Sequence, residues 1–151
     1  MTFLPVGLAL GLAVVAVGLI AATLAFPGID GVRRWIRVGP LQLHAASIAL
    51  PTFLLAMGVA GRRSQRGARW LAQALAIVAG SVLVAQPDAS QTTAVAAAAA
   101  VLLLHRSRRS ASAWVVTAAL TALGAAAWTR PDPLSPVPHV EGIVGLAVET
   151  G

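Results

Sequence analysis

Three arginines and a tryptophan stand together between two long apolar runs, and their side chains are suited to binding an anion. They are Arg33, Arg34, Trp35 and Arg37, within GVRRWIRVGP at positions 31–40. An arginine at the centre of a bilayer costs roughly 2.5 to 3.5 kcal/mol, so this segment must lie at a membrane surface. If it is helical, its arginines point one way and Trp35 faces the acyl boundary. The pattern predicts contact with an anionic lipid headgroup, a phosphate or a carboxylate; the alternative is an ordinary charged loop.

A second group of candidate residues is the tripeptide Gln86-Pro87-Asp88, which follows an apolar run. Proline cannot continue a helix, so we expect a structural turn here, with Asp88 capping the helix that follows. Asp88 could instead bind a cation or pair with Arg33 or Arg34.

The histidines offer a weaker possibility of metal binding. His44 and His139 are both expected outside the membrane, and Glu141 lies near the second of them. Because neither histidine has a carboxylate placed to complete a ligand set, we predict no metal site and no cofactor.

The composition limits the class of protein. Of 151 residues, 58% are hydrophobic and 11% are charged, whereas soluble domains carry about 25% charged residues. This mixture predicts an integral membrane protein. All eleven basic residues are arginines confined to a few loops, so the charge of +6 indicates membrane topology and phospholipid contact rather than binding of nucleic acid. The absence of cysteine excludes disulfides and thiolate metal sites.

The apolar runs predict an all-α, polytopic bundle of about five transmembrane helices, with an interfacial segment after the first. The expected helices cover residues 3–26, 41–60, 68–85, 90–104 and 111–128. The first run is too long for a signal peptide, and its Gly7, Gly11 and Gly18 predict a face on which another helix can pack closely. Residues 1–130 would form the transmembrane domain, and residues 131–151 a proline-rich extracytoplasmic tail.

The arginines also predict the orientation. The loops at 61–69 and 105–109 hold seven of them and must share one side, which the positive-inside rule makes cytoplasmic. The N-terminus is then cytoplasmic, while the arginine segment, the Gln86 turn and the C-terminal tail face outward. Arg33, Arg34 and Arg37 therefore stand on the side that the rule disfavours, which favours a binding role for them.

The order of these pieces resembles the SEDS family (FtsW, RodA, SpoVE), polytopic glycosyltransferases that polymerise lipid II into peptidoglycan. The family has an outer G-x-x-R-R-W-[IL]-x-[LV]-G segment and, later, a helix that ends in Q-P-D. The positions that match these motifs are Gly31, Arg33, Arg34, Trp35, Ile36, Gly39, Pro40, Gln86, Pro87 and Asp88. Asp132-Pro133-Leu134 resembles the start of the family's D-P-[LF]-G-x-G-Y-Q motif, which implies Asp132 as the catalytic base.

Other positions depart from the family pattern. His44, Ala45, Ala46 and Ser47 stand where the family has Q-P-S-E, and Ser135 replaces the glycine after the D-P-[LF] start. The resemblance covers about residues 1–135, the middle of a ten-helix protein, and five helices could not enclose the family's substrate cavity. Asp132 is therefore more simply the start of a turn.

The sequence leaves three hypotheses open: two give the chain a SEDS-related function, and the third treats the motif matches as convergence. The favoured one is a non-catalytic SEDS-like membrane subunit that packs into a larger complex of the bacterial inner membrane, in contact with lipids and other subunits. The enzyme alternative is a reduced or split SEDS-type glycosyltransferase that acts on lipid II beside a transpeptidase. The last is a small membrane protein whose RRW and QPD loops arose by convergence.

Overall fold

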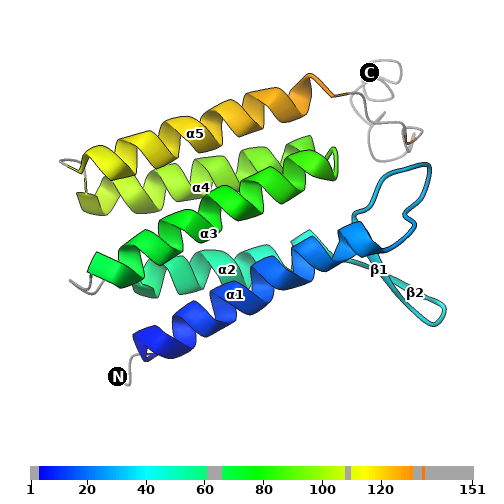
Figure 1. The fold of residues 1–151 in the computed structure, drawn as a ribbon, viewed down its shortest axis with the longest axis horizontal. Coiled ribbons are helices and arrows are strands. Elements are labelled where there is room, and N and C mark those ends of the chain that lie inside the picture. Colours follow the sequence, from blue (N-terminus) through cyan, green and yellow to red (C-terminus); the bar gives the residue numbers. More distant parts are fainter. Residues whose placement is uncertain (1–3, 61–65, 108–109, 131–133, 135–151) are drawn as a thin grey trace, which may run out of the picture.

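In the computed structural model, helices run back and forth along one direction, and a short β-hairpin projects from one end of the bundle (Figure 1). The structure describes residues 4–60, 66–107, 110–130 and 134. Their elements, in chain order, are α1 (Val6–Ala22), the 3-10 turn η1 (Thr23–Ala25), β1 (Trp35–Val38), β2 (Leu41–His44), α2 (Ala45–Ala60), α3 (Arg66–Ala85), α4 (Ala89–Ser107) and α5 (Ala111–Trp128).

Three of these helices are long and apolar enough to cross a membrane. They are α1 continued through η1 to Ala25, α3 and α5, of 20, 20 and 18 residues. At 1.5 Å per residue, 20 residues span about the 30 Å of a hydrocarbon core. The helices α2 and α4 are also apolar but have shorter apolar stretches, Ala45–Ala60 and Ala89–His105. The fold is thus mostly helical and has the character of a membrane protein, while a bundle of five spans stays a prediction.

Alanine is the commonest of the buried residues in the described helices. In α1 the buried face is largely alanine, and the helix packs against both α2 and α3. Between α3 and α5, a Cβ at Gly80 would lie 3.0 Å from Leu120 and 3.2 Å from Leu123, so the glycine permits close approach. By contrast, Gly7, Gly11 and Gly18 have no atom of the described residues within 4 Å of an added Cβ. The glycine face of α1 therefore lies outside the helix contacts of this bundle.

The arginine segment, residues 31–40, is not helical: its residues 35–40 form the first strand and the turn of a hairpin, so the condition considered for a helix is not met. Strands β1 and β2 pair antiparallel, from Trp35 opposite His44 to Val38 opposite Leu41. The two-residue loop needs a positive φ at its first position, and Gly39 supplies it with φ +58°. Trp, Ile and Val also favour extended backbone. Residues 41–44, expected as the start of the second helix, belong instead to β2, because they pair with β1 across this turn.

Pairing across the hairpin sorts its side chains onto two faces. Because side chains alternate along a strand and paired residues share a face, the apolar residues fall on one side and the polar residues, with Trp35, on the other. The apolar face consists of Ile36, Val38, Leu41 and Leu43. The opposite face consists of Trp35, Arg37, Gln42 and His44.

The turn between α3 and α4 lies at the same end of the bundle as the hairpin (Figure 1). Helix α3 ends at Ala85 and α4 begins at Ala89, so residues 86–88 connect them. This arrangement brings two segments that are far apart in the sequence together at the hairpin end. The other end holds the N-termini of α3 and α5.

Candidate functional site

The candidate site at the hairpin end is built around Asp88, which is 2% exposed. The carboxylate caps α4: Oδ1 accepts the backbone N–H of Gln91 at 3.1 Å and the hydroxyl of Ser90 at 3.0 Å. The backbone N–H of Asp88 donates to the carbonyl of Leu83 at 3.1 Å, which closes the end of α3. One residue thus ends one helix and begins the next.

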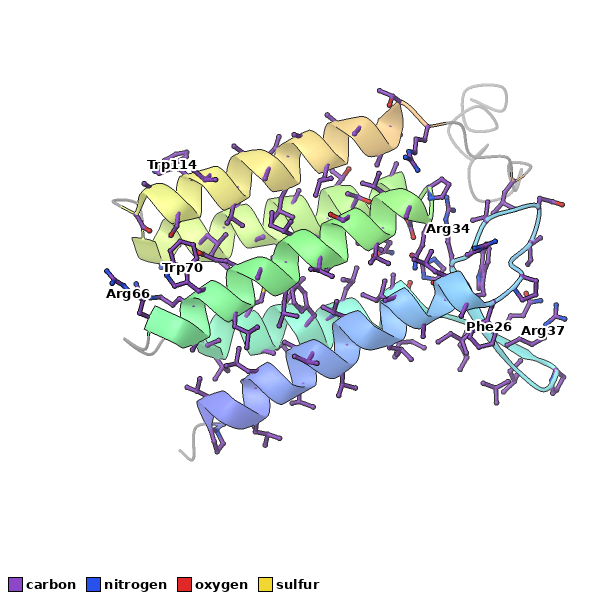
Figure 2. The ribbon with its side chains drawn as sticks, viewed as in Figure 1. Phe26, Arg34, Arg37, Arg66, Trp70 and Trp114 are labelled. Atoms are coloured by element: carbon purple, nitrogen blue, oxygen red, sulfur yellow. The ribbon has the colours of Figure 1, made fainter. Side chains whose placement is uncertain are left out.

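Arg34 reaches the same turn from the hairpin. Its Nε donates to the carbonyl of Gln86 at 3.1 Å, a terminal nitrogen donates to the carbonyl of Pro87, and Nε lies 4.0 Å from Oδ2 of Asp88. The guanidinium therefore neutralises the buried carboxylate and also satisfies carbonyls that the helix end leaves without partners. Figure 2 shows Arg34 directed at the turn and Arg37 at the far edge of the hairpin.

His44 completes this group from strand β2. Its Nδ1 accepts the backbone N–H of Ser47 at 3.3 Å, so in the neutral ring the proton sits on Nε2, which lies 3.4 Å from Oδ2 of Asp88. The ring also meets Trp35 edge to face, with centroids 5.9 Å apart. Oδ2 of Asp88 thus lies 3.4 Å from His44 and 4.0 Å from Arg34, and it accepts no hydrogen bond from the described residues.

These neighbours determine the ionisation of Asp88. Burial alone would raise the pKa of its carboxyl group. The approach of His44, the N–H of Gln91, the charge of Arg34 and the hydroxyl of Ser90 outweigh burial and hold the pKa below its ordinary value. The carboxylate is therefore ionised at neutral pH.

Gln86 ties the turn to the first helix. Its side chain is 1% exposed, and the amide nitrogen donates to the carbonyl of Ile20 at 2.8 Å and to the hydroxyl of Thr23. The hydroxyl of Thr23 in turn donates to the same carbonyl of Ile20 at 2.8 Å. The sequence analysis predicted Gln86 as a turn residue. It did not identify Thr23, which the sequence marks only by a hydroxyl group at the end of a long apolar run.

We call Arg34, His44, Gln86 and Asp88 the hairpin-end cluster. It brings together residues of both sequence motifs, GVRRWIRVGP and QPD, and adds His44, which sequence reasoning had considered only for metal binding. Among the described residues, no group of three His, Cys, Asp or Glu side chains could hold a metal ion. Asp132, His139 and Glu141 lie outside the described residues.

The three arginines of the segment do not act together. Arg33 donates to the carbonyl of Leu24 at 3.0 Å, Arg34 belongs to the hairpin-end cluster, and Arg37 lies on the hairpin face that also holds Trp35 and Gln42. There, Arg37 lines a pocket of about 440 Å³. The other lining residues are Phe26, Pro27, Gly28, Ile29, Trp35, Gly39 and Gln42. Apolar walls, an indole and one guanidinium can hold an anionic group attached to an apolar chain.

Comparison with protein-family models, with curated proteins and with solved structures finds no match to this chain. The resemblance to SEDS proteins therefore depends on the two motifs described above.

Proposed function

We propose that the chain is a non-catalytic, SEDS-like subunit that packs into a larger complex of the bacterial inner membrane. The hairpin-end cluster is the observation that carries this proposal. Arg34 and Asp88, one charged residue from each of the two motifs, contact each other and the turn between α3 and α4. Because Arg34 and Asp88 bind each other, they stabilise the fold. In a polymerase, the same side chains would have to contact the substrate instead.

The apolar face of the hairpin supports a partner at this end of the bundle. The hairpin extends beyond the helices, and its apolar residues Val38, Leu41 and Leu43 are exposed. An isolated two-stranded hairpin is only marginally stable in water, so packing on another surface would stabilise it. Apolar side chains in such a position are typical of contact with a neighbouring subunit.

The test is recovery of the complex after cross-linking in native membranes and extraction in mild detergent. We expect a SEDS-type polymerase or a penicillin-binding-protein-like transpeptidase to be recovered with the chain. The variant V38S/L41S should lose this partner, and I29S, which changes an exposed apolar residue outside the hairpin, should keep it. Recovery of a respiratory, photosynthetic or transport complex instead would contradict the proposal.

The pocket beside Arg37 favours the enzyme alternative, because it could accept the phosphate of a lipid-linked sugar. The alternative requires lipid II polymerisation by the purified chain that is abolished by Asp132→Ala and weakened by Arg37→Gln. In the favoured proposal, neither the native chain nor these variants polymerise lipid II, and Asp132→Ala leaves the complex intact.

A further inference from the structure

At the end of the bundle opposite the hairpin, a small polar pocket lies between the beginnings of α3 and α5. It has a volume of about 150 Å³ and is lined by Arg66, Arg69, Trp70, Gln73, Ser110 and Ser112. Neither SEDS motif includes any of these residues. Figure 2 places Arg66, Trp70 and Trp114 together at this end, far from Arg34 and Arg37.

The side chains around this pocket are cations and hydrogen-bonding groups. Gln73 is buried and donates to the hydroxyl of Ser112 at 3.4 Å, and the hydroxyls of Ser110 and Ser112 lie 2.9 Å apart. The bond from Gln73 is long, and only one of the two serine hydroxyls donates in the 2.9 Å contact, so the amide and the other hydroxyl can donate to an acceptor in the pocket. The adjoining N-termini of α3 and α5 add a positive partial charge.

The described residues provide no negative charge here. Arg66 and Arg69 have no carboxylate partner among them, and the two acids of the described ranges, Asp30 and Asp88, belong to the hairpin end. Two guanidinium groups beside a polar pocket with no acid to neutralise them attract an anion from outside the chain.

The size of the pocket and its position narrow the choice of anion. About 150 Å³ suits a group of a few heavy atoms, such as phosphate, and is too small for a nucleotide or a whole lipid. Trp70 and Trp114 are exposed at the same end, as tryptophans at the headgroup level of a membrane are. A cation attached to the phosphate, as in choline lipids, would be repelled by both arginines.

We propose that this pocket binds the phosphate group of an anionic molecule through Arg66, Arg69, Ser110 and Ser112. The source is either the headgroup of an anionic phospholipid or free phosphate. The site stands independently of the proposed SEDS-like function, because it uses other residues at the other end of the bundle.

Because the chain has no cysteine, a single reporter thiol can be placed next to the pocket. Ala111→Cys is exposed and outside the pocket lining, and its reaction rate with neutral N-ethylmaleimide would be measured in nanodiscs. Phosphatidylglycerol should slow the reaction about fivefold or more relative to phosphatidylcholine. If the source is free phosphate, millimolar inorganic phosphate should give the same protection in phosphatidylcholine.

Variants distinguish phosphate binding in the pocket from a general attraction of anions to the positively charged protein. R66Q/R69Q should abolish the protection, and R66K/R69K, which keeps both charges and serves as a check on folding, should keep a part of it. R33Q/R37Q removes the same charge from the hairpin end and should leave the protection unchanged. Equal rates with both lipids and with phosphate, or equal loss of protection in R33Q/R37Q and R66Q/R69Q, would overturn the proposal.

Discussion

Arg34 and Asp88 lie 4.0 Å apart (Nε to Oδ2), so the hairpin that follows α1 is held by the turn between α3 and α4. The side chain of Asp88 is almost completely buried and that of Arg34 largely so. Breaking a buried pair by removing one member is costly, because the remaining charge loses its compensation. This pair is therefore expected to control the stability of the hairpin end.

The first prediction separates charge pairing from helix capping at Asp88. Asp88→Asn keeps a residue that caps helices well but removes the charge, whereas Asp88→Ala removes both. We expect thermal unfolding in detergent to show a loss of roughly 1–3 kcal/mol for Asp88→Asn and a larger loss for Asp88→Ala. Arg34→Gln also removes the donors to the carbonyls of Gln86 and Pro87, so it should cost at least as much as Asp88→Asn, and the two together should cost less than their sum. Arg33→Gln, which removes one exposed bond, is the control; full additivity of the Arg34 and Asp88 variants would contradict a coupled pair.

The second prediction concerns pH. The folded-state pKa of Asp88 lies below 3.8, its ordinary value, so the unfolded chain takes up the proton first on acidification. The stabilisation is therefore complete above about pH 4 and is lost as the pH falls through the folded-state pKa. Unfolding measured from pH 6 to pH 3 should show this loss in the native chain, and Asp88→Asn should lack that component. Identical acid profiles for the two proteins would refute the role given to Asp88.

The third prediction concerns the link from Gln86 to the first helix. Gln86→Leu fills similar space but removes the donor to Ile20 and Thr23, so each of these buried acceptors loses one hydrogen bond. We expect a loss of roughly 1–3 kcal/mol. Gln42→Leu, an exposed change in the hairpin, should have little effect on denaturation measured in the same detergent. If both variants unfold at the same temperature, the buried amide does not hold α1 to the turn.

The fourth prediction uses two glycines in the loop before the hairpin. Gly28 has φ +75°, and an added Cβ would lie 2.5 Å from the carbonyl oxygen of Val32. Gly31 has φ +84° but open space around it. Both alanine variants are strained by roughly 1–3 kcal/mol, and Gly28→Ala should be the more destabilised because it adds a steric clash. Thermal denaturation gives the ranking, with Gly11→Ala in α1 as an unstrained control; equal stability of the two loop variants would show that the carbonyl moves away at little cost.

The fifth prediction is the membrane orientation. Gln42→Cys at the hairpin and Ala111→Cys at the start of α5 lie at opposite ends of the bundle. In intact cells, a membrane-impermeant thiol reagent should label Gln42→Cys, and Ala111→Cys should react only after the membrane is opened. Labelling of both from outside would show that the bundle does not cross the membrane as the arginines predict.

Much of the helical framework could be predicted from local sequence. The apolar runs, the proline at position 87 and the capping residue Asp88 indicate where helices lie and where α3 gives way to α4, because these signals act within a few residues. Residues 111–128 coincide with α5 for this reason. The hairpin was missed because Arg33 and Arg37 also fit helical spacing, and the conformation of Gly39 with pairing to residues 41–44 decided between the two.

Only the tertiary structure decided which polar residues meet. The sequence raised a pairing of Asp88 with Arg33 or Arg34 as one possibility; the fold selects Arg34, adds His44, and directs Gln86 to Ile20 and Thr23. It also separates Arg37 from Arg34 and brings Arg66 and Arg69 beside Ser110 and Ser112. These contacts join segments far apart in the chain, and they depend on how the helices pack and turn. Composition and periodicity describe each helix by itself, so they cannot specify such contacts.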